Sequence, residues 1–170
     1  MKRSSGILLS ISSLPSPYGI GSLGKAAYEF ADFLHASGQK YWQMLPLGPT
    51  SYGDSPYQSF SSFAGNPYLI DLDLLVEDHL LKRSDLTGMD FGSDLRHVDY
   101  GKIYESRFTL LEKAKEAGWE RDQKEIQQFC KDNTWLADYT LYMACKRHFQ
   151  MQSWTEWKDR DLRFHKTEAL

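Results

Sequence analysis

Two short apolar segments on either side of one helix constrain the fold of this 170-residue chain more than any other feature. Residues 6–14 and 41–47 have the apolar character of buried strands, and residues 25–37 have a helical apolar face that ends at Gly38. Parallel strands need a crossover connection, which is usually a helix. We therefore predict an α/β protein that begins with a βαβ unit.

The crossover contains a G-x-G-x-x-G pattern, formed by Gly19, Gly21 and Gly24. A dinucleotide-binding fingerprint has its first glycine at the tip of the strand and an acidic residue at the end of the second strand. Here residues 14–18 separate the strand from Gly19, and the second strand ends in LPLGP, with no acidic residue. We interpret the glycines as residues that permit positive φ in a tight loop and let the helix begin close to a strand. A nucleotide-binding oxidoreductase is the weaker alternative.

A long loop, residues 48–68, follows the second strand and is rich in aromatic and hydroxyl side chains. Its aromatic residues are Tyr52, Tyr57, Phe60, Phe63 and Tyr68. Sugar rings offer an apolar face for stacking and hydroxyls for hydrogen bonds, so this mixture is typical of a carbohydrate site. A loop that packs on its own aromatics is an equally good interpretation. Asp54 is a candidate catalytic acid, although a turn-forming role is favoured.

The remaining sequence predicts helices over residues 72–81, 103–117 and 122–149, with irregular sequence from 82 to 101. Asp71 is the expected N-cap of the first of these helices, and Asp73 lies in its first turn. The second helix is expected to bury Tyr104, Phe108 and Leu111, and the third to break near Asn133.

Composition and motifs exclude several classes of protein. A formal net charge of −3 gives no basic surface for nucleic acid or for a membrane. The apolar run GILLSI is shorter than a typical signal-peptide core, and no run is long enough to span a membrane. We therefore predict a soluble, cytoplasmic protein. Neither the histidines nor Cys130 and Cys145 have metal-ligand spacing, and both cysteines are expected to be free, buried thiols in helices.

Three stretches closely resemble the N-terminal part of the 4-alpha-glucanotransferases, also called amylomaltases or disproportionating enzymes. They are SSLPSPYGIGSLG, YWQMLPLGPTSYGDSPYQSFSSFAGNPYLIDL and WLADYTLYMA, within a match that runs from about Gly6 to the end of the chain. The resemblance implies the N-terminal part of a (β/α)8 TIM barrel of the alpha-amylase clan, with an inserted helical subdomain. Residues 1–72 would form the first βαβ part of the barrel with a substrate loop. Residues 73–170 would be a mostly helical insertion, truncated before the remaining barrel.

The resemblance also implies a function. It implies transfer of α-1,4-glucan segments between glucan acceptors by a retaining mechanism, without a cofactor or metal. The partners would be maltooligosaccharides, starch or glycogen. Tyr57 matches the tyrosine that stacks on the sugar at the cleavage site, and Ser55 matches a nearby polar contact. Tyr52 and Tyr104 match aromatics of a peripheral glucan site, with ordinary packing as the alternative for both.

The family's catalytic carboxylates are not among the residues that match. Its aspartate nucleophile, glutamate acid/base and supporting aspartate lie in C-terminal motifs that this chain does not contain. Because a retaining mechanism needs a pair of carboxylates, we expect the chain to be an inactive fragment when it is alone. An incomplete barrel would leave an open strand edge, which predicts marginal stability or self-association. A non-catalytic carbohydrate-binding module is the alternative function.

Overall fold

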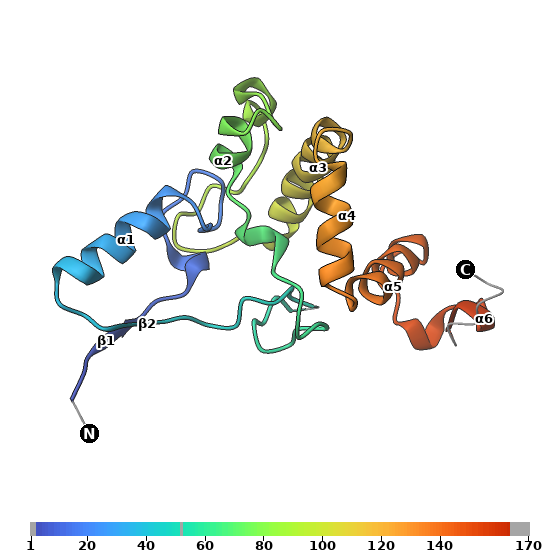
Figure 1. The fold of residues 1–170 in the computed structure, drawn as a ribbon, viewed down its shortest axis with the longest axis horizontal. Coiled ribbons are helices and arrows are strands. Elements are labelled where there is room, and N and C mark those ends of the chain that lie inside the picture. Colours follow the sequence, from blue (N-terminus) through green and yellow to red (C-terminus); the bar gives the residue numbers. More distant parts are fainter. Residues whose placement is uncertain (1–2, 52, 164–170) are drawn as a thin grey trace. The chain divides into compact units, whose positions relative to one another are not determined.

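The computed structural model of the chain describes residues 3–51 and 53–163. The chain divides into two compact units, residues 1–122 and residues 123–170. Figure 1 shows strands β1 and β2 in the first unit and helices α4 to α6 in the second. Each unit is described by itself.

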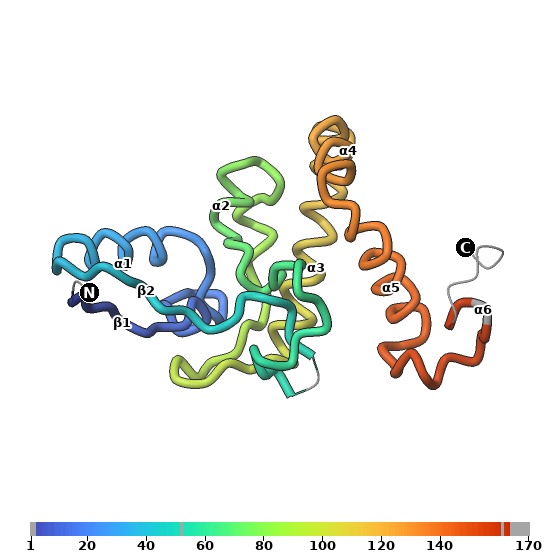
Figure 2. Tube along the Cα trace, turned by 60° about the horizontal axis from the view of Figure 1, so that its bottom comes forward, coloured from blue at the N-terminus to red at the C-terminus, as the bar shows by residue number. Residues whose placement is uncertain are grey.

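The first unit begins with the predicted βαβ unit. Strand β1 (Gly6–Leu8), helix α1 (Lys25–Ala36) and strand β2 (Tyr41–Gln43) follow one another along the chain, and the two strands pair in parallel. Ile7 lies opposite Trp42 in the register. Figures 1 and 2 show α1 running alongside the two strands. The prediction of a parallel pair joined by a helix is confirmed.

Gly38 terminates helix α1, whose last residue is Ala36, as the sequence predicts. Gly38 has φ +71°, and its N–H donates to the carbonyl of His35 at 3.0 Å. The next N–H, that of Gln39, donates to the carbonyl of Leu34 at 3.0 Å, which completes a Schellman motif. The chain then reverses into β2, where the ring of Trp42 lies 4.8 Å from that of Phe30 on α1.

Both strands are shorter than the sequence predicts. The backbone after β1 bends into a 3-10 turn at Ile11–Ser13, and Pro46 has no N–H for a ladder after β2. The face of the sheet that carries Leu8 and Tyr41 is exposed, with 58% and 64% of these residues accessible. Among the described residues the sheet has two strands, so both of its outer edges are unpaired. Self-association through this sheet stays a prediction.

The largest hydrophobic cluster of the first unit joins segments that are distant in sequence. It contains Tyr18 from the glycine-rich loop, Leu72 from helix α2 (Leu72–Glu77) and Leu110 from helix α3 (Tyr100–Gly118). Helix α2 has the predicted N-cap, because the N–H of Leu74 donates to Asp71 Oδ1 at 3.0 Å. It ends four residues before the predicted end at residue 81, since the chain turns away at His79, which has φ +59°.

Helix α3 buries a different face from the one predicted. Ile103, Arg107, Leu110 and Ala114 are buried, whereas Tyr104 is 46% exposed and Phe108 is half-buried. The prediction was wrong because an arginine at position 107 interrupts the apolar pattern of the true inner face. The helix also starts three residues before the predicted start, since the Asp99 side chain accepts a hydrogen bond from the N–H of Lys102.

The second unit contains helices α4 (Gln123–Asp132), α5 (Leu136–His148) and α6 (Arg160–Arg163). The predicted break near Asn133 is confirmed. Trp157 is buried, and its ring stacks on that of Phe149 at 5.2 Å. Cys145 is buried and Cys130 is exposed, and both are free. The expectation that both thiols are buried is therefore wrong for Cys130, which lies on the amphipathic helix α4 next to the break.

Candidate functional site

The aromatic loop after β2 folds back on itself, and its two ends meet. The N–H of Asn66 donates to the carbonyl of Leu47 at 2.8 Å, which closes the base of the loop. The side chain of Asn66 accepts a hydrogen bond from the N–H of Tyr68 at 3.0 Å and caps the 3-10 turn Pro67–Leu69. Figure 2 shows the folded-back loop between β2 and α2. A closed loop of this kind is an Ω-loop, which holds its tip at the surface.

The tip of the loop presents Tyr57 to solvent. Tyr57 is 73% exposed, and its N–H donates to Ser55 Oγ at 3.3 Å. The N–H of Gln58 donates to the carbonyl of Ser55 at 3.1 Å. Tyr57 therefore lies within a hydrogen-bonded turn. Phe63 is 71% exposed. The tip aromatics therefore do not form a buried core of the loop, in contrast to the self-packed alternative.

Asp54 forms a turn beside this tip. Its N–H donates to the carbonyl of Ser51 at 3.0 Å, and its φ of +56° lies in the left-handed region that Asp tolerates. The favoured turn-forming role is therefore confirmed. Burial raises the pKa of the half-buried Asp54 carboxyl above its ordinary value.

Tyr68 anchors the end of the loop against α3. Its buried ring lies 5.9 Å from the rings of Tyr100 and Phe108, and Phe108 in turn lies 4.9 Å from Tyr104. Burial raises the pKa of Tyr68 to about 12, and the negative charge of Asp54 acts in the same direction. The structure thus brings Asp54 and Tyr104 to one aromatic group around Tyr68. Tyr52 lies outside the described residues, so its predicted role stays a prediction.

In the glycine-rich loop, residues 18–24, the three glycines allow close packing in different ways. Only Gly19 has positive φ, at +74°, so the expectation that all three permit positive φ is corrected. Gly21 is in close contact with the backbone carbonyl of Ile11, and Gly24 with the carboxylate of Asp71. Asp71 Oδ2 also accepts a hydrogen bond from Ser22 Oγ at 2.6 Å. A carboxylate beside the N-terminus of α1 would repel a phosphate there, which argues against the dinucleotide alternative.

Tyr18, Asp73 and Arg83 form a polar clamp that holds the glycine-rich loop on α2. The hydroxyl of Tyr18 donates to Asp73 Oδ1 at 2.6 Å and accepts from Arg83 at 3.0 Å, and Arg83 also pairs with Asp73. Burial acts to raise the pKa of Asp73, but the hydrogen bonds from Tyr18 and Arg83 outweigh it and hold the pKa below its ordinary value. Burial, followed by the contact with Asp73, raises the pKa of Tyr18 to about 12.

The clamp gives the stability a pH dependence that Asp73→Asn should reduce. Because the pKa of Asp73 is lower in the folded state, its stabilisation is present above the ordinary value of about 3.9 and is lost as the pH falls through the folded value. We expect Asp73→Asn to lower the urea midpoint at pH 7 and to differ less from the wild type at pH 3. Asp32→Asn, at an exposed position on α1, is the control. A difference between Asp73→Asn and the wild type that is constant with pH would contradict this assignment.

Arg107 is completely buried and holds the end of the aromatic loop. One terminal nitrogen donates to the carbonyl of Ile70, whereas its other terminal nitrogen and Nε have no hydrogen-bond partner among the described residues. Burial lowers the pKa of Arg107 to about 10, against the opposing attraction of Asp71, so the guanidinium remains charged at neutral pH.

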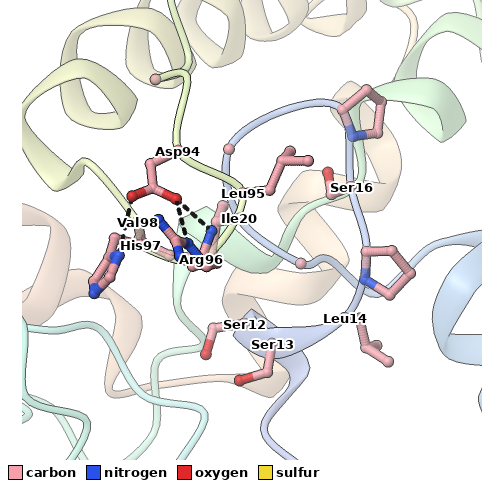
Figure 3. A pocket seen from close by; sticks show the side chains of 15 residues that line it. Ser12, Ser13, Leu14, Ser16, Ile20, Asp94, Leu95, Arg96, His97 and Val98 are labelled. Carbon is pink, nitrogen blue, oxygen red and sulfur yellow. Dashed lines mark hydrogen bonds and ion pairs between the residues drawn. The ribbon is translucent and has the colours of Figure 1, made fainter.

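A cavity of about 730 Å³ lies between the glycine-rich loop and residues 92–98. Figure 3 shows Asp94, Arg96 and His97 gathered on one side of it, with Leu14 and Ser16 across from them. Neither the cavity nor Arg107 nor the clamp was predicted. For Arg107, the spacing of positions 103, 107, 110 and 114 was a usable signal, whereas the clamp joins residues with no sequence pattern in common.

Two further features, a metal-ligand cluster and a membrane-spanning helix, are absent from the part of the chain that the structure describes. No three His, Cys, Asp or Glu side chains among residues 3–51 and 53–163 are grouped so that they could hold a metal ion. None of the described helices is both long enough and apolar enough to cross a membrane.

The βαβ unit and the exposed Tyr57 define an α/β protein in which an aromatic loop follows a parallel strand. A sequence model of the 4-alpha-glucanotransferases matches residues 9–170. The chain therefore belongs to the 4-alpha-glucanotransferase family.

Individual relatives agree with this assignment. The chain is 58% identical to a 4-alpha-glucanotransferase of Streptococcus pneumoniae serotype 4 over 99% of its length, and 50% identical to one of Clostridium butyricum over 94%. It spans 34% and 33% of these two proteins. An amylomaltase of Streptococcus agalactiae, solved in complex with acarbose, is 43% identical and matches 99% of the chain with a TM-score of 0.95. The match spans 34% of that structure, so the chain is about a third as long as its relatives.

Proposed function

We propose that this chain supplies a sugar-stacking loop to a 4-alpha-glucanotransferase that transfers α-1,4-glucan segments by a retaining mechanism. The observation that carries the proposal is Tyr57, which is 73% exposed at the tip of a closed loop in a member of this family. An exposed aromatic ring can pack on the apolar face of a glucosyl unit. Ser55, whose hydroxyl is 3.3 Å from the N–H of Tyr57, fixes the local turn and offers a polar contact next to the ring.

The proposal includes the architecture of the complete protein. In it, β1, α1 and β2 are the first elements of a (β/α)8 barrel, and the loop after β2 lies at the face where barrel active sites are built. The parallel register and the position of the loop after a strand support this arrangement. The helices after residue 72 would be an insertion between barrel elements. The catalytic carboxylate pair would lie outside this chain, as the resemblance implies.

Replacing Tyr57 with alanine in the complete enzyme tests the proposed role of this residue. We expect kcat/KM for maltotriose disproportionation to fall about 10- to 100-fold, because loss of a stacked ring removes about 1.5 to 3 kcal/mol of transition-state binding. The thermal midpoint should change little, since the side chain is 73% exposed. Tyr57→Phe keeps the ring and is the matched control. Unchanged kinetics for Tyr57→Ala would remove Tyr57 from the substrate site.

The non-catalytic module receives no support from the relatives, which are named as 4-alpha-glucanotransferases. We propose maltooligosaccharides, starch or glycogen as the glucans and the cytoplasm as the location. Tyr104, which is 46% exposed on α3, remains a candidate for a peripheral glucan contact. Its packing against Phe108 at 4.9 Å is an alternative reason for an aromatic residue at this position.

A further inference from the structure

The cavity beside the glycine-rich loop has the size of a ligand site and is open to solvent on one side. Its volume of about 730 Å³ lies within the range of roughly 300 to 1,000 Å³ that is usual for small-molecule sites. One wall is the segment from Ser12 to Gly21, and the other runs from Gly92 to Val98. The two walls are more than seventy residues apart in sequence, so the cavity is a product of the tertiary fold.

The polar groups of the cavity are arranged around one carboxylate. Asp94 Oδ1 accepts a hydrogen bond from the N–H of Arg96 at 2.9 Å, and Oδ2 lies 3.2 Å from His97 Nδ1. The hydrogen bond from the Arg96 amide, together with that from His97, lowers the pKa of Asp94, so the carboxylate is charged at neutral pH. The charges of Asp94 and Arg96 cancel, and the cavity has no net positive field for an anion. It offers instead hydrogen-bond donors beside acceptors, which suits neutral hydroxyl groups.

The remaining lining of the cavity combines the hydroxyl groups of Ser12, Ser13 and Ser16 with aliphatic side chains. Leu14, Ile20, Leu95 and Val98 contribute C–H surface between the polar groups. Leu95 is 98% exposed, although apolar side chains are usually buried. Alternating C–H surface and hydroxyl-binding groups match the two kinds of surface of a sugar ring. The described lining contains no Trp, Tyr or Phe for stacking, so binding at this cavity should be weaker than stacking on Tyr57.

The wall that contains Gly19 is fixed before any ligand arrives. Tyr18 is held by Asp73 and Arg83, and Gly19 lies in close contact with the carbonyl of Phe91. A wall that is already ordered loses little conformational entropy when a ligand binds. From this combination of shape, neutral charge and order, we propose that the cavity binds glucosyl units of an α-glucan chain. This proposal rests on the proposed function, and it adds a second contact surface for the same substrate class.

Hydrogen-exchange mass spectrometry of the full-length protein with maltoheptaose can test this site separately from the Tyr57 loop. We expect protection from exchange both in residues 12–21 and 92–98 and in residues 54–58. Arg96→Ala should weaken protection at 92–98, with an apparent affinity about tenfold lower, because a charge-assisted hydrogen bond is removed. It should leave protection at 54–58 unchanged. Lys25→Ala, an exposed cation on α1 outside the cavity, is the control for non-specific charge effects.

Each result of this experiment has a defined meaning. Protection at 54–58 alone would overturn the cavity proposal and leave the proposed function standing. Protection at the cavity alone would support the cavity and count against the role of Tyr57. Protection by inorganic phosphate at 92–98 would show an anion site and overturn the assignment to a neutral sugar. Equal effects of Arg96→Ala and Lys25→Ala would also overturn it.

Discussion

Replacing Gly19 with alanine should lower the free energy of unfolding by about 2 to 5 kcal/mol. About 1 to 2 kcal/mol of this comes from a side chain at positive φ, and about 1 to 3 kcal/mol from a forced contact. Gly19 has φ +74°, and an added Cβ would lie 2.0 Å from the carbonyl oxygen of Phe91. Because that oxygen belongs to the backbone, it cannot move aside without displacing the wall of residues 92–98. The measurement is equilibrium unfolding in urea.

Two other glycines separate the contributions to this effect. Gly38 has nearly the same φ, +71°, but nothing lies within 4 Å of an added Cβ, so Gly38→Ala should cost only the conformational free energy of about 1 to 2 kcal/mol. Gly21 does not have positive φ, and its added Cβ would lie 2.0 Å from the carbonyl oxygen of Ile11. The loss of unfolding free energy in Gly21→Ala therefore measures the cost of a forced contact without the cost of positive φ. If Gly19→Ala and Gly38→Ala destabilised the protein equally, the close contact with Phe91 would be refuted.

Replacing Arg107 with alanine should destabilise the protein by about 3 kcal/mol, from the lost packing of a buried side chain and the lost donor to the carbonyl of Ile70. Arg107 is fully buried, and it donates to the carbonyl of Ile70, at the end of the aromatic loop. Its Nε and one terminal nitrogen have no partner among the described residues, so the charged group is only partly compensated.

Arg107→Met is the matched variant because methionine fills much of the same volume without the charge. It should cost less than Arg107→Ala. Both variants remove the hydrogen bond to Ile70 and the two nitrogens without a partner among the described residues, but methionine keeps much of the buried volume filled. Urea unfolding of both variants gives the comparison. A loss for Arg107→Met as large as that for Arg107→Ala would show that the bond to Ile70, and not the filled volume, accounts for the stabilisation.

Local features of the fold could be predicted from the sequence, and features that depend on distant contacts could not. The cap at Asp71, the end of α1 before Gly38 and the break near Asn133 depend on neighbouring residues, and all are confirmed. The βαβ unit is also confirmed, because the apolar character of its segments and the short helical crossover favour one parallel pairing. The strands were predicted too long, because their ends depend on pairing and not on apolar character. The prediction of the inner face of α3 was wrong. The surroundings that accommodate the buried Arg107 are formed by other segments of the chain, which the helix sequence does not reveal.

The candidate site, too, could be predicted from the sequence only in part. The aromatic and hydroxyl composition identified the loop after β2, but composition did not separate an exposed tip from a self-packed one. The structure separates them through the exposed Tyr57 and the buried Tyr68. The roles of Tyr57 and Ser55 came from the family resemblance and stay predictions. The cavity at residues 92–98 had no sequence signal, because its walls meet only in the folded chain.

The clamp around Tyr18 also bears on how the first unit folds. Its hydrogen bonds close loops of 55 residues to Asp73 and 65 residues to Arg83, whereas the paired residues of β1 and β2, such as Gly6 and Tyr41, are 35 residues apart. Longer loops cost more chain entropy to close, so we expect the clamp to form after the βαβ unit and the α2 region have condensed. Interactions that form late stabilise the native state more than the folding transition state. We therefore expect the clamp to act mainly by slowing unfolding, and so to extend the lifetime of the folded loops on which the proposed sugar contacts depend.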